Sequence, residues 1–248
     1  MSESENVGIG RVLREEAAEL LGRARMWPGL MLYLFLFAAL GALAPWSLGF
    51  RFLSQAVVVT YASLSPLFVN TVIVESLAGA RAREGLARRS QAGAGRPVLI
   101  GKALVATLYG TASALLLLGV GLGVMNWRHW HGSPLLPPTA TLASVCALSI
   151  SLAFFWAGLG ALVSLRAASA RSAQRTLRLG FLLTMAGLLL AARVLPASWH
   201  EFWVVLFTTD ALAIHMTWLA PVLVLGGLGL LHLAYARLPA PLNSHADR

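Results

Sequence analysis

Residues 101–125 read GKALVATLYGTASALLLLGVGLGVM, and after Lys102 this stretch contains no charged side chain. About 20 consecutive apolar residues in a helix are enough to cross a bilayer core of about 30 Å. The stretch therefore predicts a transmembrane helix. The whole chain of 248 residues has the same character, since 58% are hydrophobic and only 12% are charged. That composition excludes a soluble domain, whose surface needs far more charge.

Six apolar stretches of this kind, separated by polar or Pro-rich breaks, predict an all-α membrane protein with six transmembrane helices. We expect the spans at residues 27–48, 53–74, 101–125, 139–164, 179–196 and 217–236. Residues 27–236 then form a single transmembrane domain, between an N-terminal segment 1–26 and a tail 237–248. The first 26 residues are polar and amphipathic, so we expect no cleavable signal peptide.

Basic residues fall very unevenly on the two sides of these spans. All of the 19 Lys and Arg residues except Arg51, Arg128 and Arg193 lie on one side. Cytoplasmic loops carry such an excess, so both termini are expected in the cytoplasm and the protein in the inner membrane. A net charge of +9 would suggest nucleic-acid binding in a soluble protein. Here the Arg residues lie in gaps between apolar runs, so we expect no nucleic-acid partner.

The segment before the first span predicts an amphipathic helix. Over residues 8–26, apolar side chains recur at helical spacing and charged ones occupy the other face. A helix with this pattern, leading directly into a span, is expected to lie at the lipid interface. An ordinary solvated helix is the alternative. The basic residues of the polar face are Arg11, Arg14, Arg23 and Arg25.

Residues 197–216 are too apolar for a free loop, yet Glu201 and Asp210 interrupt them. Backbone at membrane depth must still be hydrogen-bonded, so we expect a half-inserted helical segment on the outer side. A seventh span is the alternative, but it would place the C-terminus and its Arg residues outside.

Motifs for catalysis are missing from the sequence. It has no G-x-S-G for an intramembrane serine protease, no H-E-x-x-H for a zinc protease and no G-x-x-x-x-G-K-[ST] loop for ATP. We therefore expect no catalytic residue and no cofactor bound by this chain. The single Cys146 allows neither a disulfide nor a Cys-based metal cluster.

Histidines on the predicted outer side give one alternative. His129 and His131 form an H-x-H pair, and His200 could join them from the next outer segment. Imidazoles in this arrangement could bind a metal or contact haem, which would indicate a haem- or copper-handling membrane protein. Interfacial anchoring by the neighbouring Trp and Arg, with no metal bound, explains the same residues more simply.

The most informative loop is 75–102. It begins Glu75-Ser-Leu-Ala-Gly79, continues with Ala-Arg-Ala-Arg-Glu84, and closes with Leu99-Ile-Gly-Lys102. This loop resembles the first cytoplasmic loop of ABC type-2 permeases, the membrane subunits of one class of ATP-binding-cassette exporters. It departs from the family pattern at Ala80 and Ala82, where Glu is usual, and in the glycines between residues 85 and 95. The positive-inside rule alone would also produce an Arg-rich loop, but not these two ends.

The resemblance implies that the loop is the coupling element gripped by a separate ATPase subunit, which would bind ATP and Mg. The residues expected to make that contact are Glu75, Ser76, Gly79, Arg81, Arg83, Glu84, Arg88, Arg89 and Lys102. It also implies a second permease protomer, in a homodimer or a heterodimer. The spans lack charges at mid-depth, which favours an amphiphilic or hydrophobic cargo over an ion. A membrane scaffold without a transport role is a further alternative.

Overall fold

The computed structural model of the chain describes residues 10, 14, 15 and 18 and the ranges 27–78, 95–130, 132–194 and 211–238. Within these residues every regular element is a helix, which confirms the all-α prediction. The helices are α2 (Trp27–Leu48), η1 (Gly49–Leu53), α3 (Gln55–Ala62), α4 (Ser65–Leu77), α6 (Gly95–Arg128), α7 (Thr139–Arg166), α8 (Ala170–Val194) and α10 (Ala211–Tyr235).

Five helical segments are long and apolar enough to cross a membrane. They are Leu34–Leu53, Val57–Leu77, Gly95–Arg128, Thr139–Arg166 and Trp218–Tyr235. The chain is therefore built as a membrane protein, and these segments overlap five of the predicted spans. The remaining span, 179–196, lies mostly within α8, which is not one of the five. The count of six spans stays a prediction.

Three boundaries differ from the sequence prediction. The predicted span 53–74 is divided into α3 and α4 by a break at Ser63 and Leu64, because Pro66 lacks a backbone N–H and starts a new helix. The predicted polar gap 165–178 is mostly helical, since α8 already begins at Ala170. The last helix begins at Ala211, so the end of the predicted half-inserted segment belongs to α10; residues 197–210 lie outside the described residues.

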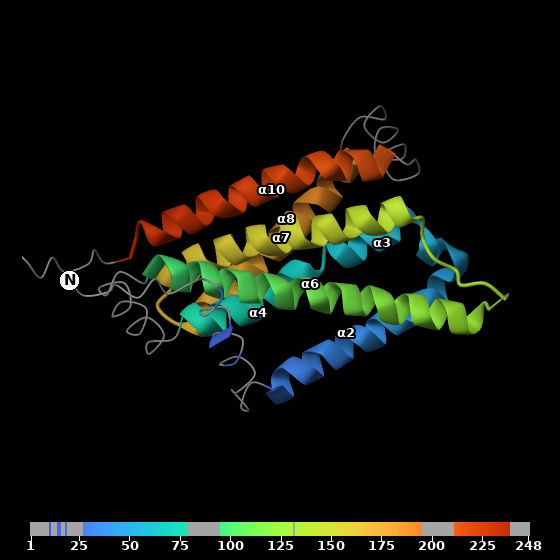
Figure 1. Ribbon diagram of the computed structural model, residues 1–248, viewed down its shortest axis with the longest axis horizontal. Coiled ribbons are helices and arrows are strands. Elements are labelled where there is room, and N and C mark those ends of the chain that lie inside the picture. Colours follow the sequence, from blue (N-terminus) through green and yellow to red (C-terminus); the bar gives the residue numbers. More distant parts are fainter. Residues whose placement is uncertain are drawn as a thin grey trace, which may run out of the picture.

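The long helices run side by side, with α2 on one side of the bundle, α10 on the other, and α6 and α7 between them (Figure 1). Helix α7 packs against α10, α4, α6 and α8, so it forms the centre of the bundle. Close approach of α7 and α10 depends on glycine. A Cβ built on Gly158 would lie 2.7 Å from the carbonyl oxygen of Gly227, and small residues at such crossings let membrane helices pack tightly.

The buried side chains form two clusters at opposite ends of the bundle. One surrounds Phe52, Tyr61 and Met125, where η1 and α3 meet the C-terminal half of α6. The other joins the end of α4 and the beginnings of α6 and α8 to α7 and the end of α10, and it includes Leu77 and Leu99. The second cluster supports the end of the bundle that carries the candidate site.

At the other end of the bundle, where α2 and α6 end, side chains connect neighbouring segments. The Arg128 guanidinium lies 4.5 Å from the ring centroid of Trp46 and donates a hydrogen bond to the Trp46 carbonyl oxygen at 3.3 Å. Asn126 exchanges two hydrogen bonds with the Leu135 backbone, at 2.6 and 2.9 Å. These contacts tie α2 to α6 and hold the connection from α6 to α7.

Candidate functional site

The two flanks of the predicted coupling loop lie at the same end of the bundle. Helix α4 ends at Leu77 and α6 begins at Gly95, and the two helices pack against each other (Figure 1). Residues 79–94 are outside the described part of the chain. That range contains six of the predicted contact residues: Gly79, Arg81, Arg83, Glu84, Arg88 and Arg89.

Glu75 joins two helices at this end. Its Oε1 atom accepts a hydrogen bond of 3.0 Å from the Nε2 atom of Gln174 on α8. The carboxylate is half-buried, so the bond is only partly exposed to competing water. Ser76 makes a local contact instead, because its hydroxyl donates to the Ile73 carbonyl oxygen at 2.9 Å. The acidic end of the loop is therefore attached to α8 as well as to α4.

Lys102 lies inside the bundle. Only 8% of its surface is exposed, and its neighbours Gly101 and Ala103 are also buried. Lysine is rarely found at so buried a position. Lys102 therefore packs with α6 inside the bundle, and its predicted contact with an ATPase subunit stays a prediction.

The first turns of α8 are amphipathic. Ala173, Leu177 and Phe181 recur every four residues and are buried. Arg171 and Arg175 are exposed on the other face. This alternation places the packed side of α8 against the rest of the bundle and leaves a basic face free for solvent or lipid headgroups.

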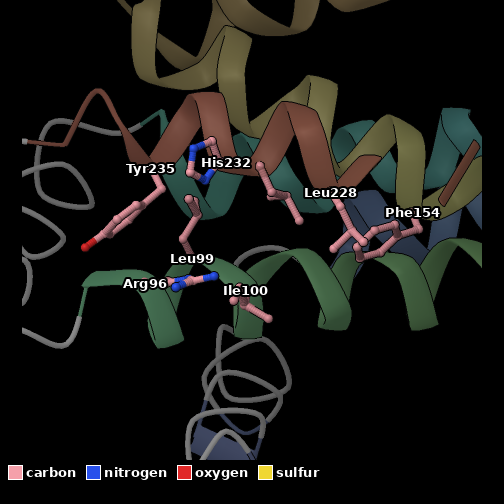
Figure 2. A pocket seen from close by; sticks show the side chains of 8 residues that line it. Arg96, Leu99, Ile100, Phe154, Leu228, His232 and Tyr235 are labelled. Atoms are coloured by element: carbon pink, nitrogen blue, oxygen red, sulfur yellow. The ribbon is translucent and has the colours of Figure 1, made fainter. Parts of the chain in front are cut away.

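A small groove lies between α6 and α10 at the same end (Figure 2). Its volume is about 100 Å³. Five of its lining residues are apolar: Leu99, Ile100, Phe154, Leu228 and Leu231. The other three are polar and come from the first turn of α6 and the last turn of α10: Arg96, His232 and Tyr235.

Several residues of this end were not singled out by sequence reasoning. Gln174 was missed, although it is an amide in a segment otherwise composed of Arg, Ser, Thr, Ala and Leu, which was a usable signal. His232 and Tyr235 were missed as lining residues, because nothing in their local sequence indicates that they share a groove with Arg96. Only the packing of α10 beside α6 brings these three residues together.

The predicted histidine cluster is described only in part. His129 lies at the opposite end of the bundle, where its ring is 4.8 Å from that of Phe50. His131 and His200 are outside the described residues. In the part of the chain that the structure describes, no group of three or more His, Cys, Asp or Glu side chains could hold a metal ion.

The predicted interfacial helix is also described only in part. Arg14 is helical and exposed. Arg11, Arg23 and Arg25 are outside the described residues. The arrangement of the polar face as a whole stays a prediction.

No protein-family model, curated protein or solved structure matches this chain.

The contact between Glu75 and Gln174 has a measurable consequence. Substituting Gln174→Ala is expected to lower the free energy of unfolding by about 0.5–1.5 kcal/mol, because one interhelical hydrogen bond is lost. The effect should vanish in a Glu75→Ala background, which removes the acceptor. Thermal unfolding in detergent measures both, with Thr176→Ala, an exposed neighbour on α8, as control. Strictly additive effects of the two substitutions would mean that the contact contributes nothing.

Proposed function

We propose that this chain is the permease subunit of an ATP-binding-cassette exporter, working with a separate ATPase subunit in the cytoplasmic membrane. The proposal begins from the resemblance of residues 75–102 to the coupling loop of ABC type-2 permeases. The five helices able to cross a membrane, together with the predicted span 179–196 as a sixth, would supply the scaffold of such a subunit. Both termini and loop 75–102 would lie in the cytoplasm, where an ATPase subunit can reach them.

The observation that carries the proposal is the bond between Glu75 and Gln174. A loop that transmits ATP-driven movement must be connected to the helices that it moves. Here one end of the loop is continuous with α4 and bonded to α8, and the other end is continuous with α6. A push on residues 79–94 would therefore act on three helices, which in turn pack against α7.

The cargo would pass between two protomers, supplied by a second copy of this chain or by a homologous chain. Apart from Lys102, the buried polar residues in the described helices are uncharged Ser, Thr and Asn side chains. An ion crossing a bilayer core usually needs charged partners there. An amphiphilic or hydrophobic cargo therefore suits the chain better. ATP and Mg would be bound by the partner ATPase.

Charge reversal in the coupling loop tests this function. The double variant Arg81→Glu/Arg83→Glu should lose crosslinking to the ATPase subunit and stimulation of its ATP hydrolysis, because the contact depends on charge complementarity. Membrane insertion should be unchanged. Both are measured on membranes from cells that express the chain together with a candidate ATPase.

The matched control is Arg171→Glu/Arg175→Glu, which changes the same charge on the exposed face of α8 at the same end of the bundle. It should keep both crosslinking and stimulation. A wild-type chain that purifies without any ATPase, and stimulates none on co-expression, would falsify the proposal.

The haem- or copper-handling alternative stays a prediction, because His131 and His200 lie outside the described residues. Its test is the metal and haem content of the purified chain.

A further inference from the structure

The groove between α6 and α10 has an apolar floor and a basic rim. Leucine, isoleucine and phenylalanine side chains form most of its wall, and its described lining contains no carboxylate. Its volume of about 100 Å³ exceeds the share of about 30 Å³ that one water molecule occupies in the liquid. The groove is therefore large enough for a part of an amphiphile, and its lining suits a molecule with an apolar part and an anionic group.

The depth of the groove corresponds to the boundary between hydrocarbon and headgroups. Helix α6 has 34 residues, and at 1.5 Å per residue its length is about 51 Å, against a hydrocarbon core of about 30 Å. Its ends must project beyond the core. Arg96 lies in the first turn of α6. It precedes Lys102, the last charged residue before the apolar run, by about 9 Å along the helix axis. His232 and Tyr235 lie in the last turn of the final candidate span.

The charges at the rim favour an anion. Arg96 supplies a guanidinium group, which binds phosphate oxygens in a bidentate manner. The N-terminus of α6, at Gly95, adds the positive end of a helix dipole. His232 and Tyr235 line the same groove from α10 (Figure 2), and the His232 imidazole can donate a further hydrogen bond.

The outer face of α10 is suited to contact with acyl chains. Large apolar side chains are exposed along its length, and Val222 and Leu225 are 64% and 68% exposed. Leu228, which lines the groove, is itself 51% exposed. The groove therefore opens onto a surface that lipid tails would cover in a membrane.

From these four observations we infer that the groove between α6 and α10 binds an anionic phospholipid of the adjacent leaflet. The phosphate would contact Arg96 and His232, and the first carbons of one acyl chain would lie against Leu99, Leu228 and Leu231. Basic pockets between transmembrane helices are known to hold such headgroups. This site requires only that the chain is in a membrane, so it does not depend on an ATPase partner.

The test uses the full chain purified in detergent, with phosphatidylglycerol as the probe and phosphatidylcholine as the zwitterionic comparison. Native mass spectrometry gives the dissociation constant of each lipid adduct. The wild type should prefer phosphatidylglycerol. Arg96→Gln should weaken phosphatidylglycerol binding about fivefold, as expected for one basic side chain at a membrane surface. Arg171→Gln, which removes an exposed Arg at the same end outside the groove, should leave binding within about twofold.

A second arm tests the acyl part of the site. Leu228→Trp should weaken both lipids, because the larger ring fills the groove. Elution volume and melting temperature establish that the variant is folded; if it is not, Ile100→Trp replaces it. The inference is overturned if Arg171→Gln weakens binding as much as Arg96→Gln, if the groove-filling variant binds both lipids normally, or if millimolar inorganic phosphate displaces the lipid. The last result would indicate a site for a small free anion.

Discussion

Substituting Phe52→Ala is expected to lower the free energy of unfolding by about 3–5 kcal/mol, the range for emptying a fully packed aromatic site. Phe52 has no exposed surface. Its ring meets that of Tyr61 edge to face, with centroids 5.5 Å apart, and it lies directly over Gly121 on α6. Removing the ring leaves a cavity where η1, α3 and α6 meet. Chemical or thermal unfolding in detergent measures the loss.

Phe50→Ala is the matched control, because it removes the same side chain from the same short helix. Phe50 is 57% exposed and has its ring against His129. The substitution should change the free energy of unfolding by no more than about 0.5 kcal/mol. Similar losses for both variants would show that Phe52 is not packed as described. The comparison also tests the rotation of η1, since turning this 3-10 helix by about 120° would place Phe50 where Phe52 lies.

Gly158→Ala is the second substitution with a large expected effect. The new methyl group would lie 2.7 Å from the Gly227 carbonyl oxygen, which is backbone and cannot move without shifting α10. Overpacking of this kind costs roughly 1–3 kcal/mol. We expect a lower melting temperature and a loosened contact between α7 and α10. A disulfide or spin-label pair across these helices would report the separation.

The control for that substitution is Gly229→Ala on α10. A Cβ at Gly229 meets nothing within 4 Å, and alanine has the higher helix propensity by about 1 kcal/mol. This variant should be as stable as the wild type or slightly more stable. If Gly158→Ala behaves in the same way, the two helices do not approach as closely as the structure describes.

Much of the fold follows from local sequence. Length and hydropathy of each apolar run are properties of consecutive residues, so the helices α2, α6, α7 and α10 were predicted, with boundaries that agree within six residues. Breaks were harder to predict. The division at Ser63 follows from Pro66, which hydropathy does not reveal, and the early start of α8 depends on how that helix packs against the bundle.

The candidate site was predicted only in part. Glu75 and Lys102 were identified from the two ends of the loop, but their environments were not. The hydrogen bond from Gln174 to Glu75 joins residues 99 positions apart, and the groove at Arg96 needs side chains from α10. Neither the hydrogen bond nor the groove can be predicted from periodicity, because each depends on which helices pack together.

The run at residues 101–125 by itself determined that the chain enters a membrane, since about 20 apolar residues in a helix satisfy their own backbone and match the bilayer core. The sequence likewise predicted one side of the membrane for most of the basic residues, from their distribution among the apolar runs. Only the tertiary structure decided that Phe52 is buried while Phe50 is exposed, and that α10 lies close to α7. The reason is that an apolar side chain is about as stable against lipid as against another helix, so hydropathy does not determine which helices are neighbours in a membrane. Shape does, through contacts such as that of Gly158 with Gly227.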